Sequence, residues 1–126
     1  MSILDTNIVI HYLHGNEKVV ALVKRHIDAD KISITCINEY ELMRGAKTAG
    51  DEVLKDLLGR FEIYYLDERS IAIAAEIYKK LKSSGKLIDD ADILIASIAI
   101  SNNEILLTAD KDFKEIRSKN INIIEI

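Results

Sequence analysis

The stretch SILDTNIVIHYL, residues 2–13, decides the fold. Its first three residues are small or apolar and predict a short buried strand, whereas the residues that follow space their apolar side chains as a helix does. One of residues 5–7 can cap the helix, and Gly15 and Asn16 are expected to stop it near residue 14. A strand that leads directly into a helix is typical of an α/β fold.

Strand and helix patterns continue to alternate along the chain. The expected strands are residues 31–36, 61–66, 104–107 and 122–124, and the expected helices are residues 17–28, 38–47, 51–58, 68–82, 89–101 and the short segment 112–117. Strands separated by helices need crossover connections, which produce parallel neighbours. The sequence therefore predicts an α/β fold, a three-layer α/β/α sandwich around a mostly parallel central sheet, in one domain over residues 1–126.

The clearest amphipathic pattern lies in the helix expected over residues 68–82. We expect one of its faces to pack inward; the residues of that face are Ile71, Ala74, Ala75, Tyr78 and Leu81.

Composition limits the class of protein. The chain has 126 residues, of which 48% are hydrophobic and 30% charged, as in an ordinary soluble globule. Its longest nearly apolar stretch, residues 93–100, is far shorter than the roughly 20 residues of a membrane span. No secretory signal pattern is visible near the start. We therefore expect a cytoplasmic protein without membrane contact.

The net charge of −4 argues mildly against binding of nucleic acid through a basic surface. That objection is met if several acids hold divalent cations, because each bound cation reverses the local sign of charge. A cage of cysteines is excluded, since Cys36 is the only cysteine.

Acidic residues stand where the ends of parallel strands should meet. Asp5 follows the first strand, Glu41 lies in the helix after the second, and Asp92 lies near the start of a helix that is otherwise apolar. Asp110 follows the strand over residues 104–107. Ligands of open parallel sheets bind at this edge. Carboxylates gathered there would repel one another strongly unless cations bind among them.

An oxygen-only ligand set suits Mg²⁺ or Mn²⁺, the usual ions where phosphates are substrates. Such ions activate water for attack on phosphorus, so this pattern predicts hydrolysis of phosphodiester bonds. Taken singly, Asp5 is more typical of a helix cap, Glu41 of a solvated helix residue and Asp110 of a turn. Neighbouring acids leave open which member of each cluster points inward; they are Asp89, Asp90 and Asp112.

Together these residues resemble the PIN domain, and within it the VapC-type toxins of prokaryotic toxin–antitoxin pairs. The resemblance covers essentially the whole chain and rests on four motifs in order. They are Leu4-Asp5-Thr6-Asn7, Glu41-Leu42-x-x-Gly45, Asp92-x-x-Ile95-Ala96, and Thr108-x-Asp110 followed by Phe113. One departure is Ser97, where the family often has a second alanine, and its small size is kept.

The resemblance implies an endoribonuclease that depends on Mg²⁺ or Mn²⁺, forms a homodimer, and is inhibited by an antitoxin protein in its cleft. It makes Asp5, Glu41 and Asp92 the core metal ligands and Asp110 the fourth acid, all four being catalytic. Thr6, Asn7 and Thr108 would form the supporting polar shell.

Basic residues near these acids are candidates for contacts with the RNA backbone. Lys111, Lys114 and Arg117 follow Asp110 closely in sequence, and Arg44 and Lys47 follow Glu41. Arg44 could equally bind an acidic residue of the antitoxin.

Three other functions compete with this interpretation. A receiver-like phosphoacceptor domain also gathers aspartates and Mg²⁺ at strand ends, but it leaves Glu41 unexplained. A non-catalytic binding module would normally lack one of the four acids. A solitary RNA-processing nuclease shares every motif and differs from a toxin in having no antitoxin. The RNA target is not encoded in any motif.

Overall fold

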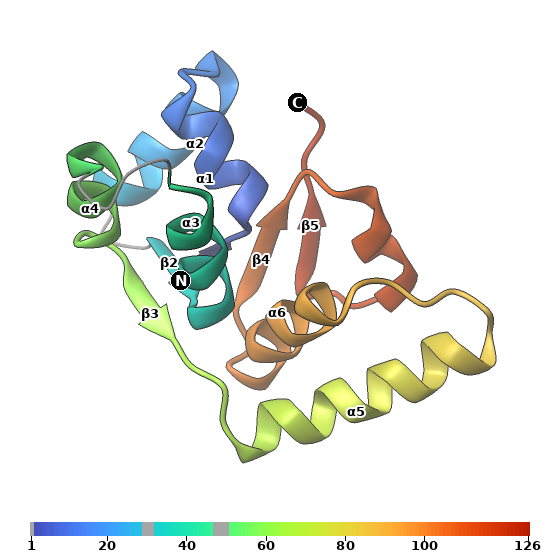
Figure 1. Ribbon diagram of the computed structural model, residues 1–126. Helices are drawn as coiled ribbons and strands as arrows, with labels where there is room; N and C mark the ends of the chain where they lie inside the picture. The colour runs from blue at the N-terminus through green and yellow to red at the C-terminus, as the bar shows by residue number, and fades with distance from the viewer. Residues whose placement is uncertain (1, 29–31, 47–50) are drawn as a thin grey trace.

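The computed structural model describes residues 2–28, 32–46 and 51–126. It contains a five-stranded sheet with the order β3-β2-β1-β4-β5 (Figure 1). The strands are β1 (Ser2–Leu4), β2 (Ile32–Thr35), β3 (Glu62–Tyr64), β4 (Ile105–Thr108) and β5 (Ile121–Ile123). All four neighbouring pairs are parallel, which confirms the predicted sheet.

Helices connect the strands as predicted. They are α1 (Thr6–Leu13), α2 (Glu17–Asp28), α3 (Cys36–Gly45), α4 (Glu52–Leu58), α5 (Glu68–Ser83), α6 (Asp90–Ser101) and the 3-10 helix η1 (Lys111–Ile116). None of the described helices is both long and apolar enough to cross a bilayer.

Alternating side chains of the strands build a core on each face of the sheet. Leu4 packs in a cluster with residues of α1, α2 and α4, whereas Ile3 packs with residues of α6 and with Phe113 of η1. In Figure 1, α6 lies between the sheet and α5, and Ala74 of α5 contacts the cluster that contains Ile93 of α6. The result is the predicted three-layer α/β/α arrangement.

The second strand ends, and the next helix begins, earlier than predicted. Thr35 is the last residue of β2 and caps α3, because its hydroxyl accepts a hydrogen bond from the backbone N–H of Asn38 at 3.2 Å. Cys36 is therefore helical rather than part of the strand. The predicted limits at Lys31 and Lys47 lie outside the described residues.

The predicted inward face of α5 is partly confirmed. Ala74 and Leu81 are buried, whereas Ile71 is 55% exposed and Tyr78 is 38% exposed. Ala75 is also exposed, and Ser70 and Ile77 pack inward instead. Apolar residues occupy two neighbouring stripes of this helix, and periodicity does not tell which stripe meets α6.

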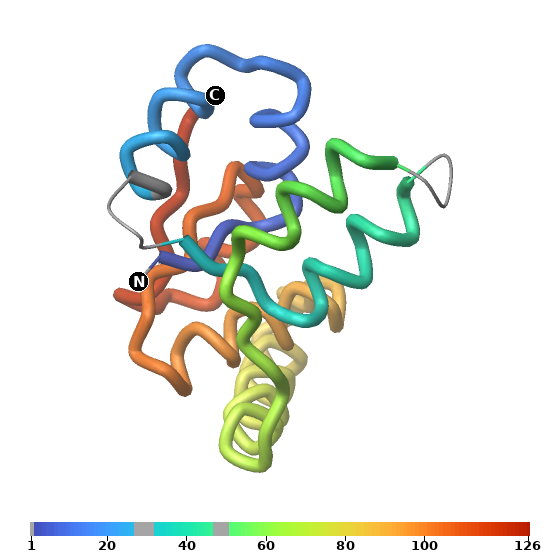
Figure 2. The backbone as a smooth tube through the Cα atoms, turned by 90° about the vertical axis from the view of Figure 1, so that its left-hand side faces the viewer, coloured from blue at the N-terminus to red at the C-terminus, as the bar shows by residue number. Residues whose placement is uncertain are grey.

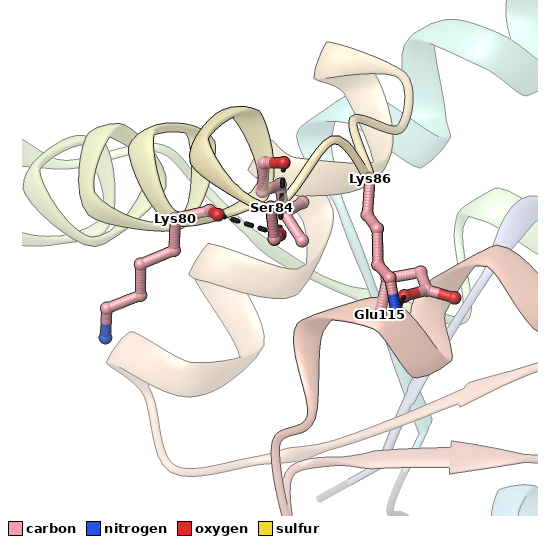
Figure 3. Close-up of polar contacts among 5 residues, drawn as sticks. Lys80, Ser84, Lys86 and Glu115 are labelled. Atoms are coloured by element: carbon pink, nitrogen blue, oxygen red, sulfur yellow. Dashed lines mark hydrogen bonds and ion pairs between the residues drawn. The ribbon is translucent and has the colours of Figure 1, made fainter.

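Polar contacts hold the segment after α5 (Figure 3). The Lys80 carbonyl, near the end of α5, accepts from the Ser84 hydroxyl at 3.0 Å and from the Ser84 backbone N–H at 3.2 Å. Lys86 then forms an ion pair with Glu115 of η1, with 3.5 Å between Nζ and Oε2. These contacts anchor the loop that leads to the start of α6.

Candidate metal centre

The carboxyl ends of the three central strands meet at one edge of the sheet. β1 is hydrogen-bonded to β2 on one side and to β4 on the other. Asp5 follows β1 directly, and Thr35 and Thr108 are the last residues of β2 and β4. All three side chains are buried. Three polar side chains therefore gather where parallel sheets bind ligands.

Asp5 lies in the middle of this edge and is 4% exposed. Its Oδ1 accepts hydrogen bonds from the backbone N–H of Thr6 at 2.9 Å and from Nδ2 of Asn38 at 3.2 Å. Its Oδ2 accepts from the Thr108 hydroxyl at 2.6 Å and from Nδ2 of Asn7 at 3.2 Å. These donors match the roughly four lone-pair positions of a carboxylate.

Asn7 and Thr108 also position the segment that carries Asp110. Oδ1 of Asn7 accepts from the backbone N–H of Ala109 at 3.0 Å. The Thr108 hydroxyl oxygen accepts from the backbone N–H of Asp110 at 3.0 Å. Asp110 in turn caps η1 by accepting from the backbone N–H of Asp112 at 2.9 Å. Asp110 is thereby fixed relative to the end of β1.

Glu41 reaches the same edge from α3. The hydroxyl of Thr6, the first residue of α1, donates to Oε1 of Glu41 at 2.7 Å. Thr6 is the neighbour of Asp5, so this bond brings the third helix to the end of the first strand. The cap at Thr35 sets the start of α3 and therefore the position of Glu41 along it.

Asp92 lies in the first turn of α6, whose later residues are mostly buried. Burial raises the pKa of Asp92 to about 7, and repulsion by neighbouring carboxylates contributes; these are Asp5, Asp110, Asp89 and Glu41. Burial likewise raises the pKa of Asp5, against hydrogen bonds that lower it, and the charges of Glu41 and Asp110 add to the rise. The four predicted acids therefore lie close enough to perturb one another.

The carboxylates differ in how many oxygen positions remain open to a cation. Among the described residues, Asp92 accepts no hydrogen bond, and Glu41 and Asp110 accept one each. Asp5 can bind a cation directly only if it gives up a donor. Asn7 is the loosest of its partners, because Nδ2 of Asn7 is shared with the Thr108 hydroxyl at 3.4 Å.

Within the described ranges, no group of three or more histidine, cysteine, aspartate or glutamate side chains forms a ready-made metal cage. Carboxylate oxygens are nevertheless the ligands that Mg²⁺ prefers, and Mg²⁺ is usually bound by one or two carboxylates with several retained waters. None of the four acids forms an ion pair with a lysine or arginine in the described part of the chain. Their oxygens and their uncompensated charge fit a hard divalent cation.

Two buried residues of this network were missed by the sequence analysis. The pattern places Asn38 at the start of a helix and Thr35 in a strand, yet both are fully buried and hydrogen-bonded to each other. A signal was present, since Thr35-x-x-Asn38 has the spacing of a helix capping box directly after a strand.

Four predicted substrate-binding residues are exposed: Arg44, Lys111, Lys114 and Arg117. Lys111 and Lys114 lie on η1, and Arg117 follows its end in a left-handed conformation with φ 56°. The Arg44 guanidinium lies 5.2 Å from the centre of the Tyr40 ring, a cation–π contact. Lys47 lies outside the described residues.

Of two hollows in the described part of the chain, one reaches the network and the other does not. A groove of about 480 Å³ runs between α1, α3 and α4, and Glu41 forms part of its wall beside apolar residues such as Ile10, Leu42 and Val53. Figure 2 shows α3 and α4 as neighbouring helices on one side of the molecule. A cavity of about 560 Å³ between α5, α6 and η1 is lined by none of the four acids.

Comparison with known proteins gives a consistent result. The family model described as the PIN domain matches residues 2–119. A protein named ribonuclease VapC1 from Methanocaldococcus jannaschii is 36% identical over 110 residues, which are 86% of this chain and 75% of the relative. Ribonuclease VapC3 from the same organism is 31% identical over 97 residues, 77% of this chain and 96% of the relative.

The chain is also similar to solved structures over nearly its whole length. VapBC2 from Rickettsia felis, bound to a DNA fragment from its promoter, matches with a TM-score of 0.81 and 28% identity over 98% of this chain and 96% of that one. FitAcB from Neisseria gonorrhoeae matches with a TM-score of 0.74 and 31% identity over 93% of this chain and 94% of that one.

Proposed function

Since the chain belongs to the PIN domain family, we propose that it is a Mg²⁺- or Mn²⁺-dependent endoribonuclease and the toxin of a VapBC-type toxin–antitoxin pair. Relatives that cover most of this chain are named ribonucleases VapC. The activity resides in one domain over residues 1–126. The protein acts in the cytoplasm, where it meets its RNA.

One observation carries this proposal. Carboxylates from four distant stretches of chain meet at one edge of a parallel sheet, where burial and mutual repulsion raise the pKa of Asp92 to about 7. Such a cluster is electrostatically unfavourable unless a cation binds among its members. We assign Asp5, Glu41, Asp92 and Asp110 as the metal-holding and catalytic residues. A bound Mg²⁺ or Mn²⁺ supplies an activated water and stabilises charge on the leaving oxygen.

The remaining side chains position these acids and bind the substrate. Thr6, Asn7 and Thr108 hold Asp5, Glu41 and the segment of Asp110 by hydrogen bonds. The RNA backbone is bound by exposed cations near the acids. We assign this role to Arg44, Lys111, Lys114 and Arg117.

The test is cleavage of a labelled RNA pool with Mg²⁺ or Mn²⁺, and with EDTA. We expect Asp92→Asn to abolish cleavage and leave the fold intact, because it removes a charge and no hydrogen bond to a described residue. Asp90→Asn is the matched control, two residues away on the same helix and exposed, and it should cleave like the wild type. Equal rates for wild type and Asp92→Asn would refute the assignment.

The groove beside Glu41 is the proposed binding site of the antitoxin. Its apolar wall suits a helix or an extended segment with apolar anchors, and Arg44 is nearby to bind an acid of the partner. A segment seated there would cover Glu41 and so block the site. Co-expression with the product of the adjacent reading frame should suppress cleavage, and Val53→Glu in the groove should restore it. Suppression unaffected by Val53→Glu would place the antitoxin elsewhere.

We also propose a homodimer. The outer stripe of α5 exposes Ile71 and Tyr78, and the chain just before this helix exposes Tyr65. Ile71 and Tyr78 are seven residues apart and so share one face of the helix, and contiguous exposed apolar groups are typical of an interface. A second copy of the chain is the proposed partner at this surface.

A further inference from the structure

Asn38 is a buried polar residue that contacts Asp5 and also Thr6, the residue whose hydroxyl is hydrogen-bonded to Glu41. It is 0% exposed and lies in the first turn of α3. Its Nδ2 donates to Oδ1 of Asp5 at 3.2 Å and to the Thr6 hydroxyl oxygen at 3.0 Å. One amide group therefore joins α3, which carries Glu41, to the segment that carries Asp5.

The orientation of this amide is fixed by β2. Oδ1 of Asn38 accepts from the backbone N–H of Thr35 at 2.9 Å and from the Thr35 hydroxyl at 2.7 Å. A backbone N–H can only donate, so the oxygen of the amide must face Thr35. The nitrogen must then face Asp5 and Thr6.

This orientation sets the direction of the next hydrogen bond. The hydroxyl of Thr6 has a single hydrogen, and its oxygen already accepts from Asn38. The hydroxyl hydrogen is therefore directed to Oε1 of Glu41, at 2.7 Å. Without the Asn38 donor, the Thr6 hydroxyl could rotate, and Glu41 would lose its fixed partner.

We propose that Asn38 is a positioning residue of the metal centre, which holds Asp5 directly and Glu41 through Thr6 in the arrangement that binds the cation. This inference rests on the proposed function. Its alternative is a purely structural role as part of the helix cap. The cap uses the oxygen of the amide, whereas the hydrogen bonds that its nitrogen makes to described residues go to Asp5 and Thr6. The two roles therefore belong to different atoms of the side chain.

The chain offers a matched control in Asn120. This asparagine is also buried, and its Nδ2 donates to the Glu104 carbonyl at 2.9 Å and to Oδ1 of Asn103 at 3.4 Å. It lies before β5, at the opposite ends of the strands from the acids. Asn38→Ser and Asn120→Ser delete the same amide from comparably buried positions.

The experiment measures Mn²⁺ affinity of the full chain without RNA, thermal stability, and the kcat and KM of RNA cleavage. Loss of a residue that orients metal ligands typically costs about 10- to 100-fold in metal affinity or activity. We expect Asn38→Ser to lower Mn²⁺ affinity and kcat by about that factor, with KM for RNA unchanged. Asn120→Ser should lower Tm similarly and leave Mn²⁺ affinity unchanged.

Thr6→Val is a second variant that tests the same hydrogen-bond chain, and it keeps the test possible if Asn38→Ser does not fold. It removes the hydroxyl between Asn38 and Glu41 and leaves the cap of α3 intact. We expect Thr6→Val to lower Mn²⁺ affinity. In the double variant Asn38→Ser/Thr6→Val, the fold-loss of Mn²⁺ affinity should be smaller than the product of the two single fold-losses. Normal Mn²⁺ affinity in Asn38→Ser or in Thr6→Val would overturn the inference. A wild-type protein that neither binds Mn²⁺ nor cleaves RNA would instead refute the proposed function.

Discussion

At the scale of single residues, the charged form of Asp92 is disfavoured by its surroundings, and the proposed site depends on this. Its pKa is raised to about 7 by burial and by the surrounding carboxylates, so at neutral pH it ionises against an unfavourable environment. The hydrogen bonds of Asp5 do not reach Asp92, which accepts none from the described residues. Relief must come from a proton or a cation.

Stability in the absence of metal should therefore fall with rising pH. A carboxyl whose folded pKa lies above its unfolded value binds more protons in the folded state, so stability is lost as pH rises from about 4 to about 7. Asp92→Asn removes this loss. We expect it to melt at a higher temperature than the wild type at pH 8 in EDTA, and a lower Tm for the variant would contradict the raised pKa.

Protons should also compete with the metal at Asp92. Below about pH 7 the carboxyl is protonated before metal binds, so Mn²⁺ affinity should fall by up to about tenfold per pH unit. Calorimetric titrations between pH 5.5 and 8 measure this dependence. Affinity that stays constant over this range would contradict the raised pKa of Asp92.

At the scale of helices and strands, the sequence predicted the kind and order of the described elements and erred on faces and ends. The inner stripe of α5 is partly misplaced because both stripes are apolar, and only contact with α6 decides between them. The predicted start of α3 is late because Cys36 continues an apolar run, whereas the Thr35 cap decides the boundary. The first error depends on a contact with another helix, whereas the second boundary is encoded locally in the spacing Thr35-x-x-Asn38.

The short helix η1 is held by one large side chain. Phe113 is fully buried against Ile95, Ala96 and Ala99 of α6 and against Leu106 of β4. We expect Phe113→Ala to lower the free energy of unfolding by about 3–5 kcal/mol, as deletions of buried aromatic rings do. Urea unfolding measures this loss. A loss below about 1 kcal/mol would show that η1 is not packed as described.

At the scale of the whole molecule, alternation of strands and helices was enough to predict a parallel sheet and the edge where the acids meet. Asp5, Glu41, Asp92 and Asp110 could be chosen from that alternation and from motif order. The contact of Asn38 with Asp5 could not be predicted in this way, because it depends on β2 lying beside β1. Strand order is a property of the assembled sheet.

The exposed apolar surface of α5 and the groove beside Glu41 should bind different partners, a second copy of the chain and the antitoxin. Ile71→Glu on α5 places a charge in the proposed dimer interface and should convert the dimer to a monomer. Val53→Glu is the matched control, because Val53 is 68% exposed on α4, in the groove assigned to the antitoxin. Light scattering after size exclusion measures the mass. A dimer that survives Ile71→Glu and dissociates with Val53→Glu would reverse the two assignments.

The central claim is that carboxylates from distant parts of the chain share a divalent cation. It is tested most directly by titrating the purified chain with Mn²⁺ at pH 8 and following free Mn²⁺ by electron paramagnetic resonance. We expect the wild type and Asp90→Asn to bind Mn²⁺ equally, and Asp92→Asn to bind it at least about tenfold more weakly. Equal binding by the wild type and Asp92→Asn, or no binding by the wild type, would contradict the claim.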